Sequence, residues 1–287
     1  MSEQSGRVSE QSGRVSEQSG RMSEQAGAGG EPRLIVTRDG SVARMTLNNP
    51  RRKNAITLEM AAAIEAFCDQ VEADAGVGAV LVEGAGDYFC SGADTRVLAA
   101  SSADPASPEA VASTSAVYRS FTRVGSLPVP TLSLVAGGAV GAGMNLALAT
   151  DLLLVTPDAV LDSGFLARGI HPGGGHVALL GRRIGYQRAA AMALLGRPLS
   201  GAEAVAQGLA YAAYDAAELL PAALELVALA AKDPELTRKV KQSLALELGS
   251  GAVPWPAAVE IERGAQMWSM ARKGREGWDR KAPKPQA

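Results

Sequence analysis

The chain has few of the residues that build metal centres and disulfide scaffolds. Its 287 residues include two cysteines, Cys68 and Cys90, and two histidines, His171 and His176. Four such side chains are too few and too scattered for a zinc site made of Cys and His, so no metal site is expected. Two cysteines also cannot staple a chain of this length as they would a small secreted domain.

The chain also lacks a strong excess of either positive or negative charge, and it has few aromatic residues. The chain carries 28 Lys and Arg against 30 Asp and Glu, a formal charge of −2, and its aromatic content is 4%. A nucleic-acid-binding surface needs a local excess of basic residues, so no nucleic-acid partner is expected. A hydrophobic content of 47% is ample for the core of a soluble globular protein.

Residues 1–32 lack a usable hydrophobic pattern. A seven-residue unit rich in Ser, Glu, Gln and Gly begins at Met1, Val8, Val15 and Met22. Each unit has one apolar residue where a coiled-coil seam needs two, so we expect a disordered tail and interpret Met22 as a candidate native start. The segment has neither the apolar stretch of a signal peptide nor the acid-poor composition of a transit peptide. A cytoplasmic protein is expected.

From residue 33 onward, strand and helix signals alternate. Asp39-Gly40 between two apolar runs predicts a hairpin, and Thr57 is a candidate N-cap for a helix over 58–67. Strands are predicted at 77–83, 131–135 and 151–155, helices at 111–124 and 144–150, and a mostly helical region from 182 onward. This alternation predicts an α/β fold with parallel pairing.

Residues 127–150 contain no charged side chain and are long enough to cross a bilayer. Two prolines, Pro128 and Pro130, and several glycines interrupt this stretch. A buried strand, turn and helix is therefore the better interpretation, and no membrane partner is expected.

Two glycine-containing turns follow predicted strands, at 86–95 and 136–143. The second could bind a dinucleotide phosphate, but its G-x-x-G-x-G order differs from the usual G-x-G-x-x-G. Each turn leaves backbone N–H groups free at the start of a helix, and two such turns could direct their donors at one oxygen atom.

Several motifs together resemble the crotonase, or enoyl-CoA hydratase/isomerase, superfamily. Tyr-Phe-Cys-Ser-Gly-Ala-Asp, residues 88–94, is similar to its A-F-x-A-G-A-D signature, and Asn-Pro-Arg-Arg-Lys-Asn-Ala-Ile, residues 49–56, to its N-x-P-x-x-x-N-A-L/I motif. The glycine turn at 138–143, Gly-Ile-His-Pro-Gly-Gly-Gly at 169–175 and the tail at 276–284 match in the same order.

The resemblance implies a spiral of ββα units over 33–226 and a C-terminal helical trimerisation region over 227–287. The assembly would be a homo-trimer or a dimer of trimers. It implies an acyl-CoA substrate and no separate cofactor, with coenzyme A forming part of the substrate. The thioester oxygen would bind the backbone N–H groups of Ala93 and Ala142. The positions that resemble family substrate contacts, with their neighbours, are Lys53, Ala55, Ser91, Ala93, Asp94 and Phe165.

The chain departs from the family at the two glutamates of a hydratase. Asn145 and Phe165 stand at those positions, and neither side chain transfers a proton at neutral pH. Asp162 and His171 are candidate replacements, although Asp162 also suits a turn and His171 a structural role. Asn145 could orient water.

His176 and Tyr88 are weaker candidates, and a nucleophilic Cys90 is disfavoured. The sequence thus predicts an enzyme that acts on an acyl-CoA thioester through a stabilised enolate, without two-glutamate hydration. The alternative is a non-catalytic acyl-CoA carrier.

Overall fold

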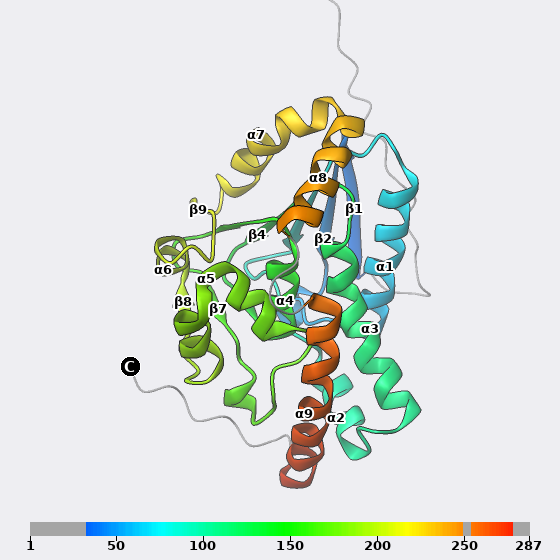
Figure 1. Ribbon diagram of the computed structural model, residues 1–287, viewed down its shortest axis with the longest axis vertical. Coiled ribbons are helices and arrows are strands. Elements are labelled where there is room, and N and C mark those ends of the chain that lie inside the picture. Colours follow the sequence, from blue (N-terminus) through cyan, green and yellow to red (C-terminus); the bar gives the residue numbers. More distant parts are fainter. Residues whose placement is uncertain (1–32, 249–253, 278–287) are drawn as a thin grey trace, which may run out of the picture.

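The computed structural model describes residues 33–248 and 254–277 (Figure 1). The repetitive segment 1–32, with Met22, and most of the tail motif at 276–284 lie outside the described residues. A hairpin of β1 (Leu34–Asp39) and β2 (Val42–Leu47) opens the fold, with Gly40 at a positive φ of 56°. No helix in the described part of the chain is both long and apolar enough to cross a membrane.

The hairpin forms one edge of a six-stranded sheet with the order β1-β2-β3-β4-β6-β9. Every pair after the hairpin is parallel, as the alternating sequence predicted. The remaining strands of this sheet are β3 (Ala79–Gly84), β4 (Thr131–Val135), β6 (Leu152–Val155) and β9 (Ala212–Ala213). The short β9 lies in a region for which the sequence predicted mostly helix.

A second sheet of three short strands, β5 (Gly138–Val140), β7 (Val160–Asp162) and β8 (Leu199–Ser200), accompanies the first. The chain passes from β4 to β5 and into α4 (Ala142–Ala149), and then from β6 to β7 and on towards α5 (His176–Ala193). Each passage is a ββα unit, and β5 pairs with β7 in parallel. These units repeat along the chain as successive turns of a spiral, which confirms the predicted α/β architecture.

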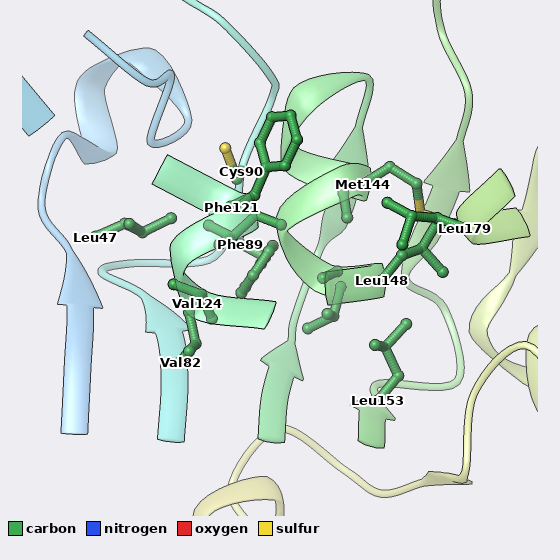
Figure 2. Packing of buried hydrophobic residues seen from close by; sticks show 14 of the residues in the cluster. Leu47, Val82, Phe89, Cys90, Phe121, Val124, Met144, Leu148, Leu153 and Leu179 are labelled. Carbon is green, nitrogen blue, oxygen red and sulfur yellow. The ribbon is translucent and has the colours of Figure 1, made fainter. Parts of the chain in front are cut away.

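Helices cover both faces of the large sheet. Along β3 the side chains alternate: Val80 and Val82 belong to one buried cluster, and Ala79 and Leu81 to the other. The larger cluster lies beneath α1 (Leu58–Ala73), α3 (Pro108–Gly125), α4 and α5, and Figure 2 shows Phe121, Val124, Met144 and Leu148 packing over the strands. The smaller cluster lies beneath α7 (Leu219–Lys232). Thr57 caps α1 as predicted, since its hydroxyl accepts the N–H of Met60 at 3.1 Å.

The C-terminal part of the described chain consists of α7, α8 (Pro234–Leu248) and α9 (Trp255–Glu276). The predicted boundary at 226/227 falls within α7. Helix α9 runs alongside α2 (Thr95–Ala103) (Figure 1). The remaining elements are α6 (Gly201–Ala206) and the single-turn helices η1 (Pro50–Arg52) and η2 (Leu166–Arg168).

Candidate active site

Stacking of two spiral turns brings Ala93 and Ala142 to equivalent positions. Cys90 pairs with Ala139 in a parallel bridge that extends the β5–β7 pairing. Ala93 follows Cys90 by three residues, and Ala142 follows Ala139 by three. Neighbouring strands lie about 4.8 Å apart, so the two alanines belong to adjacent turns of the spiral. The two glycine-containing segments seen in the sequence are therefore neighbours in space.

The backbone N–H groups of both alanines are available to a ligand. Ala142 is the first residue of α4, where a helix has no internal acceptor for its N–H. At the other turn, the backbone N–H of Ile56 donates to the carbonyl of Gly92 at 2.8 Å, and the carbonyl of Ile56 accepts the N–H of Asp94 at 2.9 Å. The N–H of Ala93, between these two residues, takes part in neither bond. Within the described residues neither N–H has a hydrogen-bond acceptor.

Glycine is required where these turns approach each other. A Cβ on Gly143 would collide with the backbone and side chain of Cys90. Gly92 has a φ of 102°, and a Cβ there would lie 2.9 Å from the carbonyl oxygen of Val140. Side chains at either position would separate the two turns.

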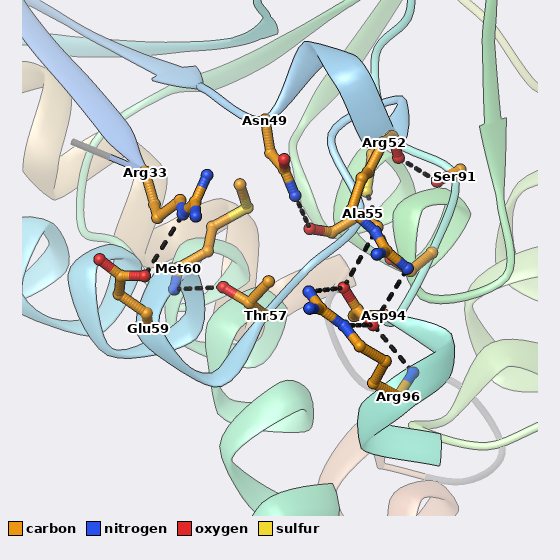
Figure 3. A network of polar contacts seen from close by, with 12 residues as sticks. Arg33, Asn49, Arg52, Ala55, Thr57, Glu59, Met60, Ser91, Asp94 and Arg96 are labelled. Carbon is orange, nitrogen blue, oxygen red and sulfur yellow. Dashed lines mark hydrogen bonds and ion pairs between the residues drawn. The ribbon is translucent and has the colours of Figure 1, made fainter. Parts of the chain in front are cut away.

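Two buried asparagines shape the loop that carries Ala55 to the site. The Asn54 side chain accepts the backbone N–H of Asn49 at 2.8 Å and donates to the carbonyls of Ala85 and Tyr88 at 2.9 and 2.6 Å. Asn49 donates to the carbonyl of Ala55 at 3.3 Å (Figure 3). Asn54, the last asparagine of the N-x-P-x-x-x-N motif, and Asn49, which precedes its proline, therefore have a structural role and hold this loop against the turn at 86–95.

Asp94 acts as a cap and a counter-charge. Its carboxylate accepts the N–H of Arg96 at 2.8 Å at the start of α2, and it pairs with the side chains of Arg96 at 2.9 Å and Arg52 at 3.3 Å (Figure 3). The hydrogen bond from the Arg96 side chain is the main cause that lowers the pKa of Asp94. Its side chain is buried and does not line the cavity described below.

A cavity of about 510 Å³ opens beside the two alanines. Arginines line part of it, apolar side chains line another, and neutral polar groups the rest: Arg51, Arg52, Ala55, Ser91, Gly92, Ala93, Thr95, Val97, Leu98, Ser101, Thr114, Val117, Tyr118, Phe121, Val140, Gly141, Ala142, Asn145, Gly164, Phe165, Arg168, Ile170, Gly173, Gln266 and Met270. Among the described residues on this wall there is no Asp, Glu, His or Lys.

Asn145 lines the cavity and is held by a buried polar chain. Its Nδ2 donates to the carbonyl of Gly173 at 2.8 Å, so its Oδ1 must accept from Nδ1 of His176 at 2.7 Å. The other ring nitrogen of His176 then accepts from the hydroxyl of Ser163 at 2.7 Å. These partners define a single neutral tautomer of His176, and burial lowers its pKa from 6.5 to about 3.

Phe165 lies between the cavity and the hydrogen-bonded side chains of His176 and Ser163. Its ring meets the His176 ring edge-on, with centroids 5.0 Å apart, and it packs with Ile170 and Met270. Phe165 therefore lines the cavity with apolar surface and keeps the imidazole away from it.

The two proposed replacement groups, Asp162 and His171, do not line the cavity. The carboxylate of Asp162 accepts the N–H of Gly164 at 2.9 Å, as in a turn, and burial raises its pKa. His171 has Nδ1 2.6 Å from the carbonyl oxygen of Pro172, and its backbone N–H donates to Ser269 at 2.7 Å. Both side chains thus have structural partners next to the site.

Lys53, Tyr88 and Cys90 also lie off the cavity wall. The Lys53 amine sits 4.6 Å from the centre of the Tyr88 ring, and burial is the main cause that raises the pKa of Tyr88. The Cys90 thiol lies 3.1 Å from the carbonyl oxygen of Asn54, and burial raises its pKa to about 12. A thiol in this state supplies no thiolate nucleophile at neutral pH.

Sequence reasoning missed the residues that α3 and α9 contribute. Tyr118, Gln266 and Met270 line the cavity, and the Tyr118 hydroxyl donates to the Gln266 side chain. Glu262, also on α9, accepts the backbone N–H groups of Gly175, His176 and Val177 at 2.8, 3.0 and 3.0 Å. No short motif signals these contacts, because α9 is more than 80 residues away from the segment it closes.

The fold and the site define the class of this protein. Stacked ββα units carry two free backbone donors beside a largely apolar cavity with an arginine-lined part. The model of the enoyl-CoA hydratase/isomerase family matches residues 37–276. The chain therefore belongs to the enoyl-CoA hydratase/isomerase family, and it is an enzyme of the hydratase/isomerase type.

Relatives and solved structures agree with this assignment. A probable enoyl-CoA hydratase of Mycobacterium tuberculosis is 40% identical over 230 residues, which cover 80% of this chain and 86% of the relative. The 1,2-epoxyphenylacetyl-CoA isomerase of Escherichia coli is 34% identical over 67% of this chain and 74% of its own length. The crystal structure of an enoyl-CoA hydratase from Mycobacterium avium subsp. paratuberculosis matches with a TM-score of 0.73 and 27% identity, over 87% of this chain and all of that one.

Proposed function

We propose that this protein acts on an acyl-CoA thioester whose carbonyl oxygen accepts the backbone N–H groups of Ala93 and Ala142. The single observation that supports this is the pair of free donors on adjacent turns beside one cavity. Two fixed donors stabilise the negative charge that develops on a thioester oxygen when an enolate forms. Backbone donors need no reorganisation during the reaction.

The remaining parts of the cavity suit the rest of such a substrate. Arg51, Arg52 and Arg168 offer positive charge to the phosphates of coenzyme A. Ala55 and Ser91 line the same cavity as these arginines and Ala93, and we assign them to the binding path of coenzyme A, with Lys53 and Asp94 in supporting positions. Phe165 and the apolar wall would enclose the acyl chain.

The proposed chemistry is not two-glutamate hydration. No carboxylate or imidazole belongs to the described cavity wall, and a positioned acid or base contributes about 10²–10⁴-fold to a rate. Asn145 could orient a water molecule or an acyl oxygen, and Asp162 and His171 would reach the substrate only if their present hydrogen bonds were broken.

Incubation with crotonyl-CoA tests this proposal. We expect binding, seen by calorimetry, with loss of the enoyl-thioester absorbance about 10²–10⁴-fold slower than in a two-glutamate hydratase measured alongside. Hydration at the rate of that reference enzyme would refute the account of Asn145 and Phe165. The alternative, a non-catalytic carrier, predicts tight binding and no turnover of any acyl-CoA.

We further propose that the protein is a homo-trimer or a dimer of trimers. Four apolar side chains at four-residue spacing lie exposed along α8: Leu236, Val240, Leu244 and Leu248. On α9, Ile261 and Trp268 are 68% and 63% exposed. Contiguous apolar faces of this kind mark protein–protein contacts.

A further inference from the structure

We propose that Tyr118 and Gln266 form a polar subsite for a hydroxyl group on the acyl chain of the substrate, beyond the carbons next to the thioester. The inference rests on the proposed function, because it assigns the acyl chain to the same cavity. It adds a substrate class: acyl-CoA thioesters whose chain bears a hydroxyl group away from the reacting carbons.

The two side chains are buried, yet one of their groups has no partner. Tyr118 and Gln266 are 6% and 5% exposed, and both line the cavity. The Tyr118 hydroxyl donates to Oε1 of Gln266, and within the described chain Nε2 of Gln266 donates to no acceptor. Nε2 is not one of the fully buried atoms without a partner, so this N–H group faces the cavity, where water or a ligand can accept it.

The pair offers both donors and an acceptor to the cavity. With the amide as assigned, the N–H groups of Nε2 are free donors and the second lone pair of Oε1 is the free acceptor, because the Tyr118 oxygen also has a hydrogen bond with the backbone of Gly174. If the amide were turned over, Tyr118 would accept from Nε2 and donate its own proton, which leaves the Tyr118 O–H as a donor and Oε1 as the acceptor. A hydroxyl group uses a donor and an acceptor, whereas a carbonyl oxygen uses only a donor.

Both side chains of the subsite are uncharged. Arg263 has its guanidinium carbon 5.1 Å from the centre of the Tyr118 ring. Arg263 pairs with Glu260 at 2.9 Å and donates to Ser115 at 3.2 Å. Burial keeps the pKa of Tyr118 well above its usual value, so its hydroxyl stays protonated. The charge of Arg263 lowers this pKa, while the charges of Glu262 and Glu260 raise it. A neutral hydroxyl fits this site better than a carboxylate, which would bury an unpaired charge.

Gly173 separates this pair from Asn145. Its carbonyl accepts from Asn145 at 2.8 Å, and a Cβ on Gly173 would collide with the Gln266 side chain. The two amides therefore lie on different sides of Gly173. Asn145 is one helical turn from Ala142 and close to the proposed thioester carbonyl. We therefore place the hydroxyl group of the ligand farther from the thioester, along the acyl chain.

Calorimetric titration tests the inference. The affinity of each ω-hydroxyacyl-CoA of five to eight acyl carbons is compared with that of the acyl-CoA of the same length without the hydroxyl group, and 3-hydroxyhexanoyl-CoA is compared with hexanoyl-CoA. At one chain length we expect the hydroxylated ligand to bind about tenfold more tightly, as two neutral hydrogen bonds allow. Gln266→Leu and Tyr118→Phe should each lower this preference several-fold. Tyr186→Phe, which alters a tyrosine that is 83% exposed, is the matched control and should keep it.

If the wild-type protein binds the two members of every pair, with and without the hydroxyl group, equally tightly, the inference is overturned and the proposed function is unaffected. A preference confined to 3-hydroxyhexanoyl-CoA would overturn it too, because that oxygen is on a carbon next to the reacting position. If no acyl-CoA binds at all, the proposed function itself fails. Should Gln266→Leu not fold, Gln266→Met and Tyr118→Phe give the same comparison.

Discussion

The side chain of Asn145 illustrates how neighbours determine what a residue can do. Its amide is fixed by Gly173 and His176, and His176 is in turn satisfied by Ser163. A buried polar chain in which every member is paired gives a rigid, uncharged wall. Asn145 therefore has no proton to transfer, and we expect it to orient a ligand.

The neutral state of His176 can be measured directly. Its pKa of about 3 predicts that its ring resonances do not move between pH 5 and 8 in an NMR titration. A His171→Asn variant identifies the signal, since the chain has two histidines. A titration midpoint near 6.5 would contradict the proposed hydrogen-bond chain.

The same pKa predicts how stability changes with pH. The unfolded chain takes up a proton on this residue below about pH 6.5, whereas the folded chain does so only near pH 3. The contribution of His176 to the free energy of unfolding is therefore full above pH 6.5 and falls as the pH is lowered towards 3. Urea titrations at several pH values measure it.

At the scale of elements, α9 closes the site through a carboxylate bound to the start of α5. Glu262 accepts three consecutive backbone N–H groups there, where the helix dipole favours negative charge. This contact holds Gln266 and Met270, one and two turns along α9, against the cavity.

Loss of that charge should loosen α9. Glu262→Gln replaces a charged acceptor of three N–H groups by a neutral one, and we expect a loss of about 1–3 kcal/mol in the free energy of unfolding. Amide hydrogen exchange should rise in α9 and at 175–177. Glu260→Gln, two residues earlier and on the exposed side of α9, is the control and should change neither the free energy of unfolding nor the exchange rates. Equal effects of both variants would refute the proposed role of the Glu262 carboxylate in holding α9.

Helix α9 has buried polar residues and exposed apolar ones, and this explains why the sequence did not reveal that the helix lines the cavity. Glu262, Gln266 and Ser269 are buried, whereas Ile261 and Trp268 are exposed. Spacing alone assigns such polar residues to solvent. Contacts between elements this distant in sequence leave no local signal, so Tyr118 and Gln266 were missed at the site.

The spiral core, by contrast, was largely predictable from local pattern. The Asp39-Gly40 hairpin, the Thr57 cap and the strand over 131–135 lie where apolar period and turn residues placed them. The two-residue strands β8 and β9 were missed, because their short runs carry no period and depend on pairing partners. The register that aligns Ala93 with Ala142 needed the structure.

At the scale of the whole molecule, the exposed apolar faces of α8 and α9 predict self-association. Sedimentation equilibrium should give a mass three or six times the 29.5 kDa of one chain. Val240→Glu combined with Leu244→Glu should shift the protein towards the monomer, because two charges would be buried at the interface. Leu195→Glu, on an exposed residue outside these helices, is the control. A wild-type monomer would contradict the proposal.

The central claim is that the N–H groups of Ala93 and Ala142 bind the thioester oxygen, and one spectrum tests it without knowledge of the reaction. Infrared difference spectroscopy of hexanoyl-CoA labelled with ¹³C at the carbonyl reports how strongly that bond is polarised. Ala142→Pro deletes one donor at the first position of α4, where proline is well tolerated. Leu58→Pro makes the same change at the first position of α1, away from the cavity.

We predict a carbonyl stretch lowered on binding to the wild-type protein and to Leu58→Pro, and a clearly smaller shift in Ala142→Pro. An unshifted carbonyl in the wild-type complex, or the same shift in all three proteins, would contradict the account.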